Sequence, residues 1–242
     1  MLTSATLVAA AGLAAVAGLV AGGHDVGGAG GAALRVRADT STPQDGTEAA
    51  VVPLGLSRLP APPRARIAGR RGCPTRGWVR GLGGADTQTV FTVSVEGLSD
   101  RTVIVDRAEV DVVRRRAPMR GTWVGCVGAG RTAGGRLIVD LDSRPARAVY
   151  ANDAASSRPP ARSLFALRRG QVEAFSVVAS GGTCWCSWRL RLRYRVSTRR
   201  RTLTIDDAGQ PFETTGSSRA VGAGYRDRWQ PLPSPPVPGH VR

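Results

Sequence analysis

Arginines suited to anion binding are concentrated in one stretch of this 242-residue chain. They stand at every second position and then consecutively, as Arg189, Arg191, Arg193, Arg195, Arg199, Arg200 and Arg201. Same-face side chains of a β-strand lie roughly 7 Å apart, so this spacing predicts a guanidinium row, which is suited to binding phosphates, sulfated glycans or lipid headgroups. The other interpretation, which we favour, is a solvated face whose charge is offset by acids of neighbouring strands, such as Glu173 or Asp206. The Arg114-Arg115-Arg116 cluster has the same two interpretations.

The four cysteines are Cys73, Cys126, Cys184 and Cys186. An even number behind an export-type N-terminus indicates disulfide bonds. Cys184 and Cys186 lie two apart on an expected strand, where Cα atoms roughly 6.5–7 Å apart would strain a direct bond. We therefore expect Cys126 to pair with Cys186 or Cys184, and Cys73 to pair with the other. A zinc site of four thiolates and a redox-active Cys-x-Cys are the alternatives, although paired Cys-x2-Cys knuckles are absent.

The sequence offers little for catalysis. Its histidines are His24 and His240, and neither can be placed beside a nucleophile. No phosphate loop, nucleotide fingerprint or zincin motif is present. The acidic pairs Asp140/Asp142 and Asp206/Asp207 match a calcium site or a catalytic carboxylate pair, but such residues are common in turns. We expect no catalytic residue, no cofactor and no metal.

The arginine row requires a long strand to position it. Trp188, Leu190, Leu192, Tyr194 and Val196 alternate with the arginines, which gives one apolar face and one charged face. A helix of period 3.6 would not sort these residues onto two faces. We predict a long antiparallel strand whose apolar face is buried between two sheets while its guanidinium face lies in water.

The surrounding sequence predicts an all-β domain. Turn signals recur about every ten residues, and no amphipathic helix is evident. This pattern favours an antiparallel β-sandwich of immunoglobulin-like or fibronectin-like architecture, with a partly open barrel as the alternative. Trp123 precedes Cys126, so the antibody signature is absent. The expected strands are 89–96, 102–106, 108–115, 136–142, 163–167, 171–179, 184–197 and 202–206.

Composition divides the chain into four parts. Residues 1–23 are uncharged and apolar, which predicts a transmembrane anchor or a signal segment. Residues 24–72 are rich in Gly and Pro and are expected to be a flexible linker, with a short strand near 49–54 as an option. Residues 73–216 form the predicted sandwich. Residues 217–242 end in a Pro-rich tail that we expect to be disordered, with recognition by an SH3-type domain as the alternative.

The N-terminal segment admits three interpretations. We favour an uncleaved anchor over a cleaved signal, and a buried Ala-rich helix is the third. Arg35 and Arg37 follow the segment and by the positive-inside rule would remain cytoplasmic. The cysteines favour the opposite orientation. We therefore expect a single-pass protein of the cell membrane with an extracytoplasmic domain, or alternatively a secreted protein.

The formal net charge is +16, and all of the basic residues are arginine. Such a field attracts nucleic acid and anionic lipid. However, no recognition helix, zinc finger or RNP-type motif accompanies it, so we do not expect specific nucleic-acid binding. A composition rich in Ala, Gly, Val, Arg and Pro is typical of a GC-rich genome, which accounts for part of the arginine excess.

Two motifs carry a resemblance to other proteins. The first is Cys184-Trp-Cys-Ser-Trp, which opens the alternating strand, and the second is Thr204-Ile-Asp-Asp-Ala-Gly-Gln-Pro-Phe. Together they resemble uncharacterised actinobacterial membrane or exported proteins, in which a Cys-x-Cys-x-Trp strand leads into a hairpin ending in Gly-x-Pro-Phe. The likeness covers about residues 75–216. It implies a family without an assigned activity.

These observations predict a membrane-anchored or secreted binding or scaffolding module of the cell envelope that does not catalyse a reaction. Its partner would be a protein or an anionic polymer. The alternative is an anion binder that uses the arginine face to hold a phosphate polymer, an anionic glycan or nucleic acid. A hydrolase that uses loop carboxylates is the third hypothesis.

Overall fold

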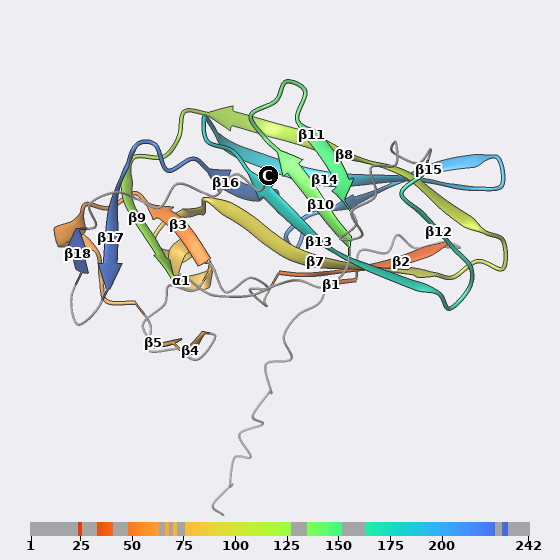
Figure 1. Ribbon diagram of the computed structural model, residues 1–242, viewed down its shortest axis with the longest axis horizontal. Coiled ribbons are helices and arrows are strands. Elements are labelled where there is room, and N and C mark those ends of the chain that lie inside the picture. Colours follow the sequence, from red (N-terminus) through yellow and green to blue (C-terminus); the bar gives the residue numbers. More distant parts are fainter. Residues whose placement is uncertain are drawn as a thin grey trace, which may run out of the picture.

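The computed structural model describes residues 24–25, 33–40, 48–62, 66–67, 70–71, 76–126, 135–151, 163–225 and 229–231. Within these residues the chain is built almost entirely of β-strands, arranged as two large sheets with a shared core (Figure 1). The short α1 (Arg76–Gly81) and the 3-10 turn η1 (Leu56–Arg58) are the helical elements of the described chain. The all-β, two-sheet prediction is therefore confirmed.

The first sheet has six strands among the described residues. In spatial order they are β1 (His24–Asp25), β2 (Leu34–Asp39), β7 (Gln88–Gly97), β13 (Val172–Ser180), β10 (Gly135–Asp140) and β11 (Arg147–Ala151). Strand β7 is the predicted 89–96 segment, and its inward residues Phe91, Val93 and Val95 are fully buried. The alternation that predicted β7 and β10 arises because one face of each strand packs on the core.

The second sheet has ten strands in the described chain. Its order is β12 (Phe165–Leu167), β8 (Val103–Arg116), β14 (Trp185–Val196), β16 (Phe212–Thr215), β6 (Ala85–Asp86), β3 (Glu48–Val52), β9 (Gly121–Cys126), β17 (Ala220–Tyr225) and β18 (Trp229–Pro231). Strand β15 (Arg199–Ile205) pairs with β14 beside this path. A separate two-stranded ribbon joins β4 (Arg66–Ile67) to β5 (Arg70–Arg71).

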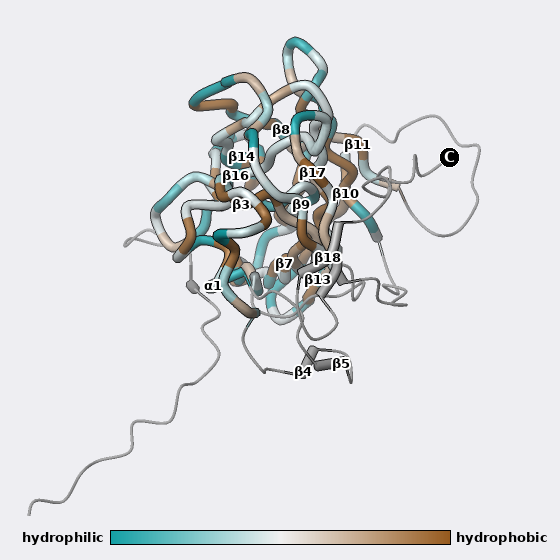
Figure 2. Tube along the Cα trace, turned by 90° about the vertical axis from the view of Figure 1, so that its left-hand side faces the viewer, coloured by the Kyte–Doolittle hydropathy of each residue, from teal (hydrophilic) through white to brown (hydrophobic). Residues whose placement is uncertain are grey.

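Strand β14 supplies the centre of the core, as the sequence predicted. Trp188, Leu190 and Leu192 are 0% exposed, while the arginines between them reach solvent. The Trp188 ring packs against Phe212 from β16 and Phe91 from the facing sheet, with centroids 4.9 and 6.4 Å away. Figure 2 shows hydrophobic stretches within the body of the molecule and hydrophilic ones in its outer loops.

The sheets are mixed, which departs from the purely antiparallel prediction. Most ladders are antiparallel, but β10 pairs with β13, β16 with β6 and β17 with β9 in parallel. Strand β8 also differs, because it unites the two expected strands 102–106 and 108–115. Its pairing with β14 shifts register near Asp106 and Val113, and a bulge allows one strand to continue through such a break.

The expected linker and tail both contribute strands, so the predicted boundaries at residues 73 and 216 are wrong. Strand β2 pairs with β7 and buries Leu34, Val36 and Ala38. Strand β3 confirms the optional strand near 49–54, and β17 and β18 come from the expected tail. The expected anchor or signal, residues 1–23, lies outside the described residues, as does the Pro-rich end of the tail. Among the described helices, none has the length and apolar character needed to cross a bilayer.

Two smaller cores lie at the end of the second sheet that contains β3 and β9, here called the β3–β9 end. One includes Val52, Val79 and Val124 and joins α1 to the sheet. The other includes Val51 and Trp123 and lies on the opposite face. Because each face of β3 packs on its own cluster, neither face of this strand is free for solvent.

Candidate anion-binding surface

Each arginine of the β14 row has an acidic partner. Four ion pairs follow the strand: Arg195–Asp106 at 3.2 Å, Arg193–Glu109 at 2.7 Å, Arg191–Asp111 at 2.5 Å and Arg189–Asp206 at 3.7 Å. Neighbouring acids therefore offset the charge of the row, as the solvated-face interpretation predicted for Asp206. Glu173 does not take part, because it accepts a hydrogen bond from the Tyr150 hydroxyl at 3.0 Å.

Strand register explains this compensation. Arg191 and Arg193 of β14 lie opposite Glu109 and Arg107 of β8, on the same sheet face. Each guanidinium reaches diagonally to the next acid along β8. Asp106 lies where the register shifts, and its carboxylate is aimed at Arg195. Exposed pairs of this kind contribute about 0–1 kcal/mol each, so they neutralise charge more than they stabilise the fold.

The compensation ends at the turn of the β14–β15 hairpin. Ser197 and Thr198 join the strands, and Val196 lies opposite Arg199. No carboxylate of the described chain forms an ion pair with Arg199, Arg200 or Arg201. In addition, Arg200 lies directly opposite Arg195 on the same sheet face. Like charges placed opposite each other are destabilising, so this positive end costs the fold some stability.

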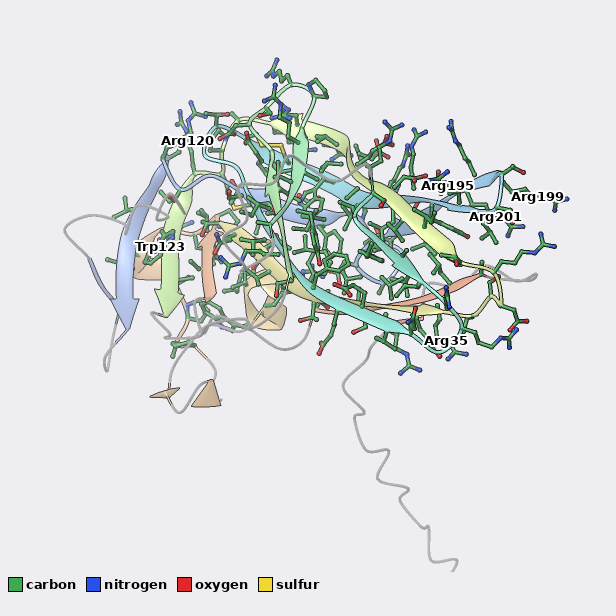
Figure 3. The ribbon with its side chains drawn as sticks, turned by 45° about the vertical axis from the view of Figure 1, so that its right-hand side comes forward. Arg35, Arg120, Trp123, Arg195, Arg199 and Arg201 are labelled. Carbon is green, nitrogen blue, oxygen red and sulfur yellow. A yellow bond between two sulfur atoms is a disulfide. The ribbon has the colours of Figure 1, made fainter. Side chains whose placement is uncertain are left out.

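Two open hollows of about 600 Å³ each flank the hairpin end. The first is lined by Asp106, Arg107, Arg193, Tyr194, Arg195, Arg200, Arg201 and Thr202. The second is lined mainly by the β7–β8 and β14–β15 turns, and its charged residues are Asp100, Arg101, Arg169, Arg199 and Arg201. Together the two linings contain eight different arginines and two aspartates. Figure 3 shows Arg195, Arg199 and Arg201 at this end of the molecule, with Arg120 and Trp123 toward the other end.

The structure moves the candidate site from the middle of β14 to the hairpin end. Arg189 and Arg191 lie away from the hollows and are paired with acids. Arg101, Arg107 and Arg169 join the site from other segments, and sequence reasoning did not single them out. Arg101 and Arg169 each lie beside a turn, because Arg101 follows Ser99-Asp100 and Arg169 precedes Gly170, whereas Arg107 lies within β8 and has no such signal.

The Arg114-Arg115-Arg116 cluster divides among different roles. The Arg115 guanidinium donates to the carbonyl oxygens of Leu141 at 2.5 Å and Ser143 at 3.4 Å, which fastens β8 to the end of β10. The Arg116 guanidinium lies 5.1 Å from the centroid of the Trp185 ring, within cation–π range. Arg114 is exposed. The cluster is therefore not a continuous anion site.

The cysteine prediction is wrong for the Cys-x-Cys pair. Cys184 and Cys186 are bonded to each other, and their Cα atoms are 5.6 Å apart. This distance is shorter than the spacing expected for two same-face residues of an extended strand, because Cys184 precedes the first residue of β14. The bond excludes a four-thiolate zinc site. Cys73 lies outside the described residues, and for Cys126 only the backbone, in β9, is described.

The acidic pairs Asp140/Asp142 and Asp206/Asp207 accept hydrogen bonds in turns or form ion pairs with arginines. Asp140 accepts hydrogen bonds from the backbone of Asp142 and Ser143, and Asp206 accepts one from Gly209 N at 2.8 Å. Asp207 is buried and forms an ion pair with Arg80. Within the described residues, no three metal-ligating side chains gather in one place.

Asp142 holds the loop that leads into the disulfide. Its carboxylate accepts hydrogen bonds from Gly182 N at 2.7 Å, Thr183 N at 3.0 Å and Thr183 Oγ1 at 2.6 Å. Partial burial alone would raise the pKa of Asp142, but these hydrogen bonds and the nearby Arg115 together lower it from 3.8. The ionised carboxylate therefore stabilises the fold above pH 3.8, and this stabilisation is lost as the pH falls through the lowered pKa.

Replacing Asp142 with asparagine is expected to lower the free energy of unfolding by about 1 kcal/mol at pH 7, after allowance for solvent screening. The difference from wild type should shrink as the pH falls through the lowered pKa, because the wild-type carboxyl becomes protonated. Urea denaturation at pH 7 and at about pH 2.5 measures both values. Asp100→Asn is the control, because the Asp100 side chain is 81% exposed. A loss that persists unchanged at low pH would contradict the role of the charge.

A buried charge cluster connects α1 to both sheets. Burial raises the pKa of Asp86, against the opposing effect of Arg76 and Arg80. Arg76 Nε lies 3.1 Å from the Asp86 carboxylate, and the same guanidinium donates to the carbonyl oxygens of Thr40 and Val90. Each of these contacts joins α1 to a strand or a strand end. We interpret the cluster as a structural clamp.

No protein-family model, curated protein or solved structure matches this chain. The resemblance to actinobacterial exported proteins therefore stays a prediction. The functional argument depends on the geometry of the hairpin end alone.

Proposed function

We propose that this protein is a non-catalytic binding module of the cell envelope that holds an anionic partner with the end of its β14–β15 hairpin. The single observation that carries the proposal is the gathering of eight arginines around two hollows at that end. Four of them are ion-paired, namely Arg107, Arg169, Arg193 and Arg195. No carboxylate of the described chain forms an ion pair with the other four, which are Arg101, Arg199, Arg200 and Arg201. This charge is local. In the middle of the same strand, Arg189 and Arg191 are each paired with an acid.

Arginine chemistry favours a binding role for this surface. Guanidinium groups present several donors in a plane and match the oxygens of carboxylates, sulfates and phosphates. Several such groups around an open hollow create a positive potential that accelerates the approach of an anion. Binding also relieves the repulsion between Arg195 and Arg200, so the ligand restores stability that the free protein lacks.

The compartment and the finer architecture belong to the same proposal. A bonded Cys184–Cys186 pair is typical of an oxidising compartment, which supports an extracytoplasmic domain, either anchored or secreted. We infer that the two facing sheets form an immunoglobulin-like or fibronectin-like sandwich to which the β3–β9 end is appended. A hydrolase is less favoured, because the carboxylates suited to it are used by turns and arginines.

Reversing two charges at the hairpin end tests the proposal. The double variant Arg199→Glu/Arg201→Glu is expected to bind a sulfated polysaccharide or a long-chain polyphosphate about tenfold more weakly, with a shallower dependence on salt. Affinity is measured by fluorescence anisotropy at several salt concentrations. Both residues are exposed, so the fold should be unaffected by far-UV circular dichroism.

The matched control is Arg114→Glu/Arg120→Glu, which changes the net charge equally at two exposed positions away from the hollows. We expect this variant to keep most of the affinity. If both double variants lose affinity equally, the binding depends on net charge and the hairpin end is not the site. If neither loses affinity, the proposed function is wrong.

A further inference from the structure

Strand β15 has a free edge in the described structure. It pairs with β14 on one side through seven residue pairs, from Leu190–Ile205 to Val196–Arg199. No described strand pairs with its other side. Figure 1 shows the hairpin extending to the right-hand end of the molecule. An unpaired strand edge is a template for another strand, because it presents backbone donors and acceptors in a row.

The register identifies which backbone groups face this edge. Val196 and Arg199 flank a two-residue turn, so they form a hydrogen-bonded pair, and such pairs alternate along an antiparallel ladder. Arg199, Arg201 and Leu203 therefore direct their N–H and C=O groups toward β14. Arg200, Thr202 and Thr204 direct theirs outward. The free edge thus offers three donors and three acceptors at regular spacing.

Arginines stand on both faces of this edge. Arg200 shares the outer face of the sheet with Arg195, whereas Arg199 and Arg201 share the opposite face with Val196 and Tyr194. A hollow lies on each side of the hairpin, and Arg201 contributes to both. An added strand would point alternate side chains to the two faces. Acidic side chains would then meet arginines on either face.

The same charges select against unwanted pairing. Two copies of β15 aligned edge to edge would bring arginine against arginine, and charged edge residues are a common defence against such association. A neutral apolar strand added at this edge would leave the repulsion between the hairpin arginines unchanged. An acidic strand would reduce this repulsion, because its carboxylates pair with the arginines. The edge is therefore selective for partners of opposite charge.

We propose that the anionic partner is an extended acidic polypeptide segment of another protein, which adds as a strand along the free edge of β15. This inference rests on the proposed function, and it specifies the class of ligand. Backbone hydrogen bonds to Arg200, Thr202 and Thr204 give the segment its register. The arginines of the two faces give the preference for glutamate and aspartate side chains.

The test uses a fluorescent ten-residue peptide of alternating glutamate and threonine. Thr202→Pro removes one outward N–H and leaves the inward ladder intact, and proline is tolerated on the solvent side of an edge strand. We expect Thr202→Pro to weaken peptide binding about tenfold, a typical cost of a lost backbone contact between strands. Thr202→Ala removes the same side chain but keeps the N–H, so it is the reference, and Thr202→Pro should bind about tenfold more weakly than Thr202→Ala does. Far-UV circular dichroism and urea denaturation check that the proline variant folds.

A second probe does not depend on any variant. The same peptide with alternate backbone amides N-methylated keeps its charge but loses the donors for one side of a ladder. We expect wild-type protein to bind the methylated peptide about tenfold more weakly, for the same reason. Long-chain polyphosphate has no backbone donors, and Thr202→Pro should leave its binding unchanged.

The outcomes separate the two proposals. If Arg199→Glu/Arg201→Glu abolishes binding while Thr202→Pro and N-methylation have no effect, strand addition is wrong and the anion-binding function stands. If wild-type protein binds polyphosphate but not the acidic peptide, the ligand class is wrong. If it binds neither, both proposals fail, and the arginines serve as a guard against edge-to-edge association.

Discussion

Replacing Trp188 with alanine is expected to lower the free energy of unfolding by about 3–5 kcal/mol, the cost typical of removing a large buried ring. Trp188 is 0% exposed, and its indole packs on Phe212 and Phe91, which are themselves stacked with centroids 4.5 Å apart. Alanine would leave a cavity that both sheets line. Chemical denaturation followed by circular dichroism measures the loss.

A second substitution separates the ring from its polar atom. Trp188 Nε1 donates to Thr214 Oγ1 at 2.9 Å, and this hydroxyl lies 2.6 Å from Thr89 Oγ1. Trp188→Phe keeps most of the ring but leaves the buried threonine pair one donor short, so we expect a loss of about 1–3 kcal/mol. A loss below about 1 kcal/mol for Trp188→Ala would mean that this face of β14 does not form the core.

The parts of the fold that the sequence predicted share one property, which is strict alternation. In β14 the apolar residues Trp188, Leu190 and Leu192 recur at every second position, and burial follows the same period. Strands β7 and β10 repeat this pattern. Alternation is local information, so it is readable without knowledge of the neighbouring strands.

The features that the sequence did not predict depend on strand register or on where a strand begins. The pairing of Arg193 with Glu109 exists because β8 and β14 are aligned as they are, and no spacing within either segment specifies that alignment. Strand β2 lies beside a Gly- and Ala-rich stretch that resembles a linker, yet Leu34, Val36 and Ala38 alternate. The disulfide depended on where β14 begins. The strand begins at Trp185, one residue after Cys184, so the two cysteines do not both lie in an extended strand and can bond to each other.

The candidate site was recovered in part for the same reasons. The arginine-rich stretch includes the hairpin end, but its spacing does not distinguish the ion-paired arginines from the others. Arg189 and Arg191 attracted attention through their spacing, but Asp206, directly after β15, pairs with the first and Asp111 of β8 pairs with the second. Arg199 and Arg200 lie beyond the reach of those acids, because the hairpin turn follows Val196, which lies opposite Val103 at the start of β8, and the first acid of β8 is Asp106. Net charge at a surface is thus decided by the neighbouring strands.

Replacing Gly121 with alanine is expected to be the most damaging change at the β3–β9 end, with a loss of about 3 kcal/mol or more in the free energy of unfolding. Gly121 begins β9 with φ of 151°, a backbone conformation that other residues rarely adopt. An added Cβ would also collide with the Val52 carbonyl oxygen and lie 2.9 Å from Pro53 Cα. Backbone atoms cannot move aside cheaply, so β3 and β9 would have to separate.

The matched control for this substitution is Gly55→Ala. Gly55 lies three residues after Val52 with φ of −70°, and an added Cβ there meets no atom within 4 Å. We therefore expect Gly55→Ala to be neutral or slightly stabilising, because alanine restricts the unfolded chain.

Hydrogen exchange shows which strands the Gly121→Ala substitution destabilises. Gly121→Ala should expose the amides of β3, β9 and β17 while those of β14 stay protected, since the Trp188 core does not include this end. Equal losses for both glycines, or uniform exposure of both ends, would show that the β3–β9 end has no packing of its own.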